Sequence, residues 1–264
     1  MKYLLFTLLL VSGCAANPYR ETNKVYRKNA KTLAKQIRQL PPADSLQPPG
    51  KWAGTTNFNL RKPNIVVIHH TAQEACEKTL TTFTRTASQV SAHYVICKDG
   101  TVHHMLNDYL RAWHGGNSKW GNLTDINSGS IGIELDNNGF ETFTEIQITS
   151  LLRVLEKLKN LYGIPKANFI GHSDIAPGRK VDPNRNFPWE KLSENGYGMW
   201  YDTTGIVVPP GFDAMQALRI IGYNTKDTAA ALYSFKLHFV QTDSSRILTE
   251  ADKKVIYNLI GKTE

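Results

Sequence analysis

The sequence lacks several features that would assign it to a class at once. It has no His-Glu-x-x-His motif, which excludes the metalloproteases built on that helical motif. It has no internal repeat and no low-complexity stretch, so no repeat architecture is expected. Charged residues make up only 20% and hydrophobic residues 41%, which is the composition of a globular and not a disordered chain. The 264 residues suffice for one medium domain with a small second module.

Acidic residues are also in deficit, because 23 Asp and Glu face 31 Lys and Arg and leave a formal charge of +8. This excess favours an anionic partner, and nucleic acid, anionic lipid and anionic cell-wall polymer all fit that description. The amino terminus narrows the choice. Residues 4–11 are apolar except for Thr7, a run too short for a bilayer span of about 20 residues. We interpret it as a secretory signal, which argues against nucleic acid as the partner.

Cysteine is scarce, with three residues in the whole chain. Cys14 follows Val-Ser-Gly at the end of the apolar run, which resembles a bacterial lipoprotein signal; the alternative is an ordinary signal with an incidental Cys. Acyl chains on Cys14 would anchor the protein without a transmembrane helix. Ala15, in place of Asp, suggests the outer membrane of a Gram-negative cell, with the protein facing the periplasm. Cys76 and Cys97 could be bridged in an exported protein, but sequence does not fix the distance between them.

Residues 15–50 predict a basic tether and linker. An apolar stripe at helical spacing is formed by Tyr26, Ala30, Leu33, Ile37 and Leu40. The other faces carry Lys24, Arg27, Lys28, Lys31, Lys35 and Arg38. Such a helix could lie on an anionic surface, or its stripe could pack on the catalytic domain. Prolines at 41–42 and 48–49 then interrupt any helix.

Residues 51–203 show the pattern of an α/β domain. Strands are expected near residues 64–68, 92–97, 101–106, 130–135 and 168–171. A helix is expected over about 145–162, with a capping box at Thr144 and Gln147 and a stop at Gly163. Alternating strands and helices predict a mixed central β-sheet flanked by helices.

Residues 204–264 predict a small module of three short helices. Asp213 is a candidate cap for a helix ending at Ile221, and Thr225 for another running to about Val240. Thr249 and Asp252 have capping-box spacing for a third. A module of this size gains little stability alone, so we expect it to dock on the main domain.

Several histidines follow expected strands. His69 comes directly after one apolar run and His172 after another, and strand ends at one sheet edge can bring distant residues together. A His at a strand end is often structural, but two of them with Asp182 downstream shift the interpretation toward a metal site. Spacing does not decide between His69 and His70, although only one can face a given side of the sheet.

Five motifs occur in order along the chain. They are Ile-Val-Val-Ile-His-His-Thr-Ala, Val-Ser-Ala-His-Tyr-Val-Ile, Ala-Trp-His-Gly-Gly, Ser-Ile-Gly-Ile-Glu-Leu and Gly-His-Ser-Asp-Ile-Ala-Pro-Gly-Arg-Lys-x-Asp-Pro. Over roughly residues 50–195 the chain resembles the type 2 N-acetylmuramoyl-L-alanine amidases, relatives of phage T7 lysozyme and of peptidoglycan recognition proteins. Its start and its helical end resemble the outer-membrane branch, in which the last module looks like a peptidoglycan-binding domain.

The resemblance implies a set of roles. His69, His172 and Asp182 are expected to bind one Zn²⁺, with Glu134 as proton carrier and Lys180 stabilising the oxyanion. The simpler alternatives are a strand-end salt bridge for Glu134 and a solvated loop position for Lys180. Trp113 and His114 are candidate substrate contacts, and Asp174 is expected to be structural.

One position departs from the family pattern, since Asn184 replaces the Gly that often follows the Asp-Pro pair. We expect Asn184 to keep the turn by adopting a left-handed conformation, and Arg185 to alter the cleft rim.

The implied activity is hydrolysis of the amide between N-acetylmuramic acid, intact or 1,6-anhydro, and the L-alanine of the stem peptide. Peptidoglycan or its muropeptides would then be the partner, together with a membrane through the lipid anchor. Two alternatives are a non-catalytic peptidoglycan-binding protein on the same fold and an envelope zinc hydrolase acting on another amide.

Overall fold

The computed structural model describes residues 17–39 and 55–262, in two units divided at Asn59 and Leu60. The first unit contains α1 (Arg20–Ile37), an amphipathic helix in which no residue is buried. The expected signal, Cys14 and most of the linker lie outside the described residues. None of the described helices is both long and apolar enough to cross a membrane.

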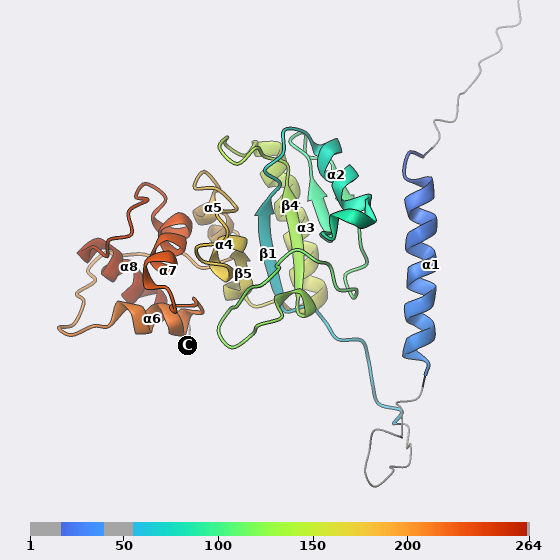
Figure 1. Cartoon of the computed structure of the whole chain (residues 1–264). Coiled ribbons are helices and arrows are strands. Elements are labelled where there is room, and N and C mark those ends of the chain that lie inside the picture. The colour runs from blue at the N-terminus through green and yellow to red at the C-terminus, as the bar shows by residue number, and fades with distance from the viewer. Residues whose placement is uncertain (1–16, 40–54, 263–264) are drawn as a thin grey trace, which may run out of the picture. The chain divides into compact units, whose positions relative to one another are not determined.

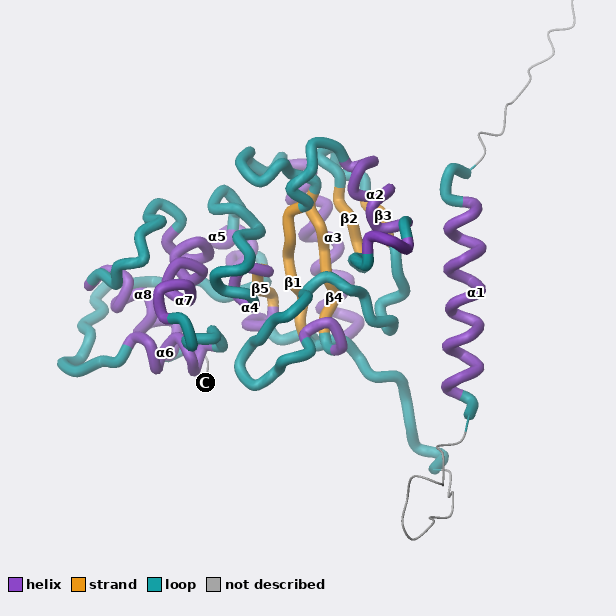
Figure 2. Tube along the Cα trace, in the orientation of Figure 1, coloured by secondary structure: helices purple, strands orange, loops and turns teal. Residues whose placement is uncertain are grey.

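The second unit is built on a five-stranded mixed sheet in the order β3-β2-β4-β1-β5 (Figures 1 and 2). The strands are β1 (Ile65–His70), β2 (Tyr94–Ile96), β3 (Val102–His104), β4 (Ser130–Leu135) and β5 (Phe169–Gly171). β2, β4, β1 and β5 are mutually parallel, while β3 pairs antiparallel with β2 at the edge. The expected mixed sheet is therefore confirmed.

The two faces of the sheet have different chemistry because successive strand residues point to opposite sides. On one face, Val66 and Ile68 of β1 and the odd-numbered residues of β4 pack on α3 (Glu145–Tyr162). On the other face, Ile65 and Val67 pack in a second, smaller cluster with Ile170 and Ile175. His69 belongs to this second face, and so does Glu134, which pairs with it in register across β1 and β4.

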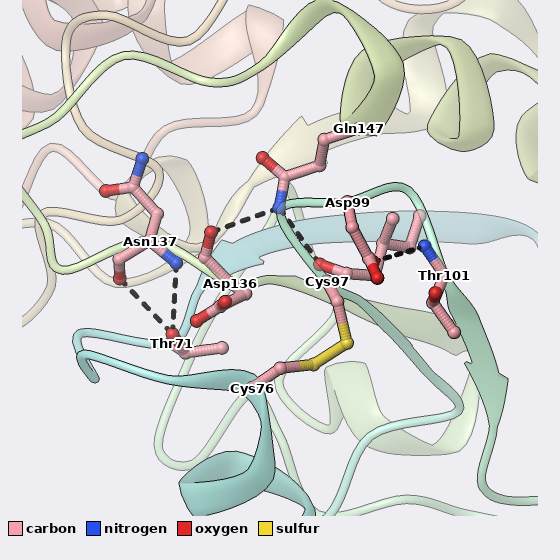
Figure 3. Close-up of a disulfide and its surroundings, with 9 residues drawn as sticks. Thr71, Cys76, Cys97, Asp99, Thr101, Asp136, Asn137 and Gln147 are labelled. Atoms are coloured by element: carbon pink, nitrogen blue, oxygen red, sulfur yellow. Dashed lines mark hydrogen bonds between the residues drawn. A yellow bond between two sulfur atoms is a disulfide. The ribbon is translucent and has the colours of Figure 1, made fainter.

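Helix α3 has the bounds that the sequence predicts. The Thr144 hydroxyl accepts a hydrogen bond from the Gln147 backbone N–H at 3.2 Å, and Gly163 ends the helix in the left-handed conformation at φ 69°. The Gln147 side chain then donates to the carbonyls of Ile96 and Asp136, at 2.9 and 3.0 Å (Figure 3). Helix α3 is thus fixed to the ends of β2 and β4.

A disulfide joins Cys76 to Cys97, the pairing that sequence left open (Figure 3). Cys76 begins α2 (Cys76–Thr84), and Cys97 directly follows β2. The bond holds α2 against the carboxyl end of β2.

Past the sheet, the chain forms α4 (His172–Ile175), α5 (Trp189–Glu194), α6 (Ala214–Ile221), α7 (Thr228–Phe235) and α8 (Glu250–Ile260). The last three share their own apolar core and gather beside α4 and β5 (Figure 1). Asp213 caps α6 and the Thr249–Asp252 box caps α8, as expected. The cap of α7 is Asp227 and not Thr225, and a π-helical turn, Lys236–Val240, continues that helix.

Candidate active site

Three side chains from distant parts of the sequence converge at the carboxyl ends of β1 and β5. His69 is on β1, His172 begins α4 directly after β5, and Asp182 lies in the following loop. His69 Nδ1 is 2.9 Å from His172 Nδ1, and Asp182 Oδ2 is 3.1 and 2.9 Å from these two nitrogens. All three residues are buried. The second histidine of the pair, His70, points to the opposite side and accepts a hydrogen bond from the Asn184 backbone N–H.

The protonation of the two imidazoles is set by contacts on their far sides. His172 Nε2 lies 3.2 Å from the carbonyl oxygen of Gly115, which can only accept a hydrogen bond. His69 Nε2 lies 3.0 Å from His114 Nδ1, and His114 Nε2 lies 3.1 Å from the Ser130 hydroxyl, which donates to the Ile126 carbonyl. If each Nε2 carries the proton, every bond in this chain has one donor and one acceptor. Both Nδ1 lone pairs then face Asp182.

This donor set fits a divalent metal ion. Two neutral imidazoles and a carboxylate are the ligands of many zinc sites that keep a fourth position open. Burial, and then repulsion from His172, lowers the pKa of His69 to about 4, so its lone pair is free at neutral pH.

Glu134 stands beside the three-residue cluster without a full set of partners. Its Oε1 lies 4.0 Å from His69 Nδ1, and its buried Oε2 has no hydrogen-bond partner among the described residues. Burial, and then repulsion from Asp182, raises the pKa of Glu134 to about 8, and the positive charge of Lys180 opposes this shift. A carboxylate with an unused oxygen costs free energy unless something else uses it, such as a cation or a proton in transit.

The alternating residues of β4 explain the Ser-Ile-Gly-Ile-Glu-Leu motif. Ser130, Gly132 and Glu134 all face the site, whereas Ile131, Ile133 and Leu135 face α3. Ser130 bonds His114, and Gly132 leaves room for the same ring, since a Cβ there would lie 2.5 Å from His114 Cγ. Only glycine allows the imidazole of His114 to approach the strand this closely.

The loop from Trp113 to Gly116 packs against the site and against β4. The Asn127 side-chain oxygen accepts hydrogen bonds from the backbone N–H groups of His114 and Gly115, at 3.2 and 2.8 Å. The Arg179 guanidinium donates to the Gly115 carbonyl at 2.7 Å, which joins this loop to the loop that carries Asp182. One loop therefore supports both imidazoles.

The two candidate substrate contacts, Trp113 and His114, differ in their exposure to solvent. Trp113 is 49% exposed, so its ring is accessible. His114 is buried, and its Nδ1 lies 3.0 Å from His69 Nε2, so it holds the His69 ring in place. Sequence reasoning missed this role because nothing in the spacing pairs residue 114 with residue 69.

Asn184 also departs from expectation. Left-handed backbone occurs, among the described non-glycine residues, only at Ala72, Gln89 and Gln241. Asn184 is instead buried, and its amide donates to the Asn137 side chain and the Glu141 carbonyl at 3.0 and 3.2 Å. Its side chain therefore ties the Asp182 loop to residues 137–141. Arg185 beside it is exposed.

The fold and this site define a hydrolase with a buried two-histidine, one-aspartate group able to hold a metal ion. Residues 59–185 match the family model described as N-acetylmuramoyl-L-alanine amidase. N-acetylmuramoyl-L-alanine amidase AmiD of Escherichia coli K12 is 30% identical over 210 residues, 67% of this chain and 75% of the relative. The chain belongs to the N-acetylmuramoyl-L-alanine amidase family, and it is an enzyme that hydrolyses the amide between N-acetylmuramic acid and L-alanine.

Other relatives and solved structures agree. The 1,6-anhydro-N-acetylmuramyl-L-alanine amidase AmpD of Haemophilus influenzae is 38% identical over 104 residues, 39% of this chain and 56% of the relative. A structure of AmpDh3 from Pseudomonas aeruginosa superposes with a TM-score of 0.71 at 28% identity, covering 80% of this chain and 96% of that one. E. coli AmiD, solved with the substrate anhydro-N-acetylmuramic acid-L-Ala-D-gamma-Glu-L-Lys, gives a TM-score of 0.68 at 27% identity, covering 81% and 94%.

Proposed function

We propose that the amidase is zinc-dependent and that His69, His172 and Asp182 hold one Zn²⁺. The observation that carries this proposal is the convergence of two Nδ1 lone pairs and a carboxylate oxygen within 3.1 Å of one another. When bound, Zn²⁺ lowers the pKa of a water molecule and polarises the scissile carbonyl. With both protons on Nε2, two Nδ1 lone pairs and a carboxylate oxygen would repel one another at these distances unless a cation lay between them.

Glu134 is the residue that we assign to proton transfer. Its free Oε2 can accept a proton from the attacking water as the water oxygen bonds to the lactyl carbonyl carbon. The same proton then passes to the alanine nitrogen as the C–N bond breaks, so that L-alanine leaves as an amine. The raised pKa, about 8, suits a group that must gain and lose a proton near neutral pH.

Lys180 is the residue that we assign to the developing oxyanion. It lies two residues before Asp182, it is partly exposed, and its charge acts on Glu134, His69 and His70. A fixed cation close to the carbonyl stabilises the tetrahedral transition state more than the ground state.

We infer that the substrates include 1,6-anhydro-muropeptides. The relatives that support this are the AmpD amidases, named for that substrate, and E. coli AmiD in its complex with an anhydro-muramyl tripeptide. Trp113, exposed at the start of the loop that supports both imidazoles, offers an aromatic surface to the sugar or the peptide.

We also propose that the chain is a lipoprotein of the outer membrane, facing the periplasm and anchored through Cys14. The apolar run that ends at Cys14 supports this location, and so does the Cys76–Cys97 disulfide, since such bonds persist in oxidising compartments. In that place the enzyme would meet wall fragments directly.

A digestion experiment tests the catalytic proposal. The zinc-loaded protein is incubated with defined anhydro-muropeptides, and mass spectrometry follows the release of free stem peptide. Glu134→Gln should lower kcat by about 10²- to 10⁴-fold at unchanged zinc content, whereas Glu145→Gln, an exposed matched control, should be silent. His172→Ala should lose zinc. A muropeptide that stays intact but co-purifies with wild-type protein would indicate a receptor, and full activity of Glu134→Gln would refute the mechanism.

A further inference from the structure

Asp174 is a fully buried carboxylate two residues after the ligand His172. Within its own segment, its Oδ2 accepts a hydrogen bond of 2.7 Å from the Gly171 backbone N–H and so caps α4, the turn that begins with His172. Ser173, between the two, donates its backbone N–H to the Asp182 carbonyl at 2.8 Å. The geometry of α4 therefore determines where two of the three ligands lie.

The remaining partners of Asp174 come from the C-terminal helical module. The Tyr223 hydroxyl donates to Oδ1 at 2.7 Å, and His238 Nδ1 lies 2.7 Å from Oδ2. The His238 ring is itself held by stacking on Trp189, with centroids 3.8 Å apart and an interplanar angle of 16°. All of these side chains are buried, so water cannot replace a donor that is lost.

Other contacts of the module converge on the same region. A Cβ at Gly178, in the loop between His172 and Asp182, would lie 3.1 Å from the Ala230 Cβ, so α7 packs directly on this loop. The Gln241 side chain donates to the Phe187 carbonyl at 2.7 Å, just beyond Asp182. The module thus supports the segment that carries two ligands from three separate points.

We propose that Tyr223 and His238 are positioning residues for the metal site, and that the C-terminal module completes the scaffold of His172 through Asp174. This inference rests on the proposed zinc role of His172. It gives the module a task besides any binding of cell wall, because the module supplies two of the three donors that fix the Asp174 carboxylate beside a ligand.

The test measures zinc affinity directly, by competition with a chromogenic chelator, in the full chain with Cys14→Ser. Tyr223→Phe removes one oxygen and His238→Leu removes the other donor. We expect each to weaken zinc binding by about tenfold, the lower end of the range for outer-shell partners. His238→Asn keeps an N–H near the Nδ1 position and should retain more affinity than His238→Leu. The d–d absorption of the Co²⁺-substituted protein should shift in the same variants.

Kinetics on a small soluble anhydro-muropeptide separate this role from substrate binding. A positioning role predicts a lower kcat at sub-saturating zinc with KM unchanged. The matched control is Thr249→Val, which removes the cap of α8 without touching Asp174 and should leave zinc affinity unaltered.

Folded Tyr223→Phe and His238→Leu proteins with wild-type zinc affinity and Co²⁺ spectrum would overturn the inference, and a change confined to KM on polymeric wall would do the same. Wild-type protein that binds no zinc would overturn the proposed function and this inference together. Zinc-bound, active wild type with unaffected variants would overturn the inference alone.

Discussion

At the scale of single residues, the site depends on groups that never touch substrate. His69 and His172 present Nδ1 to the centre only while His114 and the Gly115 carbonyl hold their Nε2 atoms. Outer-shell partners of this kind fix the tautomer of a ligand and its ring orientation. The free energy of metal binding should therefore respond to side chains one bond removed from the ligands.

His114→Phe should test this dependence. The substitution keeps an aromatic ring at position 114, but the Nε2–H of His69 loses its hydrogen-bond acceptor. The imidazole of His69 then loses its fixed orientation. We expect zinc affinity to fall by about 10- to 100-fold, measured by chelator competition at neutral pH. His104→Phe, at a partly exposed histidine that contacts Asp108 and not the ligands, is the control. Equal zinc affinity in His114→Phe and wild type would remove the outer-shell role.

Gly132→Ala probes the same ring from the strand. The added Cβ would lie 2.5 Å from His114 Cγ, a distance that forces the imidazole or the strand to move. We expect a loss of about 1–3 kcal/mol in the free energy of unfolding, as for other overpacked interiors, together with weaker zinc binding. Gly129→Ala, where a Cβ meets nothing within 4 Å, should cost far less in urea unfolding. Similar midpoints for the two variants would contradict the packing argument.

At the scale of secondary-structure elements, one buried carboxylate joins three of them. Asp108 accepts hydrogen bonds from Tyr94 of β2 at 2.9 Å, from Tyr162 of α3 at 2.9 Å and from His104 of β3 at 3.1 Å. Burial acts to raise the pKa of Asp108, but these three bonds outweigh it and lower the pKa below the usual value near 4. The ionised form is therefore the one that stabilises the fold.

The sign of this shift sets a pH dependence for Asp108→Asn. The pKa of Asp108 is lower in the folded protein than in the unfolded chain. The ionised carboxylate therefore contributes its full share to the free energy of unfolding above about pH 4, and this share is lost as the pH falls through the folded-state pKa. We expect the variant to be about 1–3 kcal/mol less stable at pH 6, with the difference shrinking toward pH 3. Urea unfolding at several pH values measures this difference in stability, with Glu156→Gln on α3 as the control. A difference that grows on acidification would show that the sign is wrong.

The disulfide joins α2 to β2 across 21 residues of chain. Closing a loop of this length lowers the conformational entropy of the unfolded chain and so raises its free energy by about 3 kcal/mol. The double variant Cys76→Ser, Cys97→Ser should lose roughly this amount of stability in denaturant unfolding. Zinc affinity should stay unchanged, because the two cysteines form a group separate from His69, His172 and Asp182. An unchanged unfolding midpoint would mean that the bond does not form in the protein.

Elements with strong local signals were predicted with accurate bounds. The period of α3 and its caps at Thr144 and Gly163 are both visible in the sequence, and the same holds for Asp213 before α6 and the box before α8. Helix α2 was missed, since it is short and lacks a side-chain cap hydrogen bond. The start of α7 was displaced because Thr225 and Asp227 are both acceptable caps and only tertiary packing chooses between them.

The sequence likewise predicts some residues of the site and misses others. Residue types at strand ends, together with the family resemblance, predict that His69, His172 and Asp182 bind one metal ion. The fold brings these three side chains together in space. The bonds from His114 to His69 and from Tyr223 and His238 to Asp174 span 45 to 64 residues. No local periodicity encodes such contacts, because they arise only when distant parts of the chain pack.

At the scale of the whole molecule, positive charge is concentrated in one helix. Helix α1 carries six Lys and Arg residues against the single acid Glu21, a net charge of 6 − 1 = +5 within a chain whose total is +8. Its apolar residues Tyr26, Leu33 and Ile37 are at least partly exposed. A basic amphipathic helix close to an acylated Cys14 would add electrostatic attraction to a single lipid anchor.

This charge distribution leads to a prediction about membrane binding. Full-length protein with Cys14→Ser, which has no acyl chain, should still co-sediment with phosphatidylglycerol vesicles at low salt, but not with neutral phosphatidylcholine vesicles. Because the attraction is electrostatic, it should weaken as ionic strength rises and the Debye length shortens. Reversing Lys28, Lys31 and Lys35 to Glu should lower partitioning at least about tenfold. Reversing the exposed Lys62, Lys166 and Lys226 changes the total charge equally but leaves α1 intact. If both triple variants lose binding to the same extent, net charge is responsible and α1 has no special part in it.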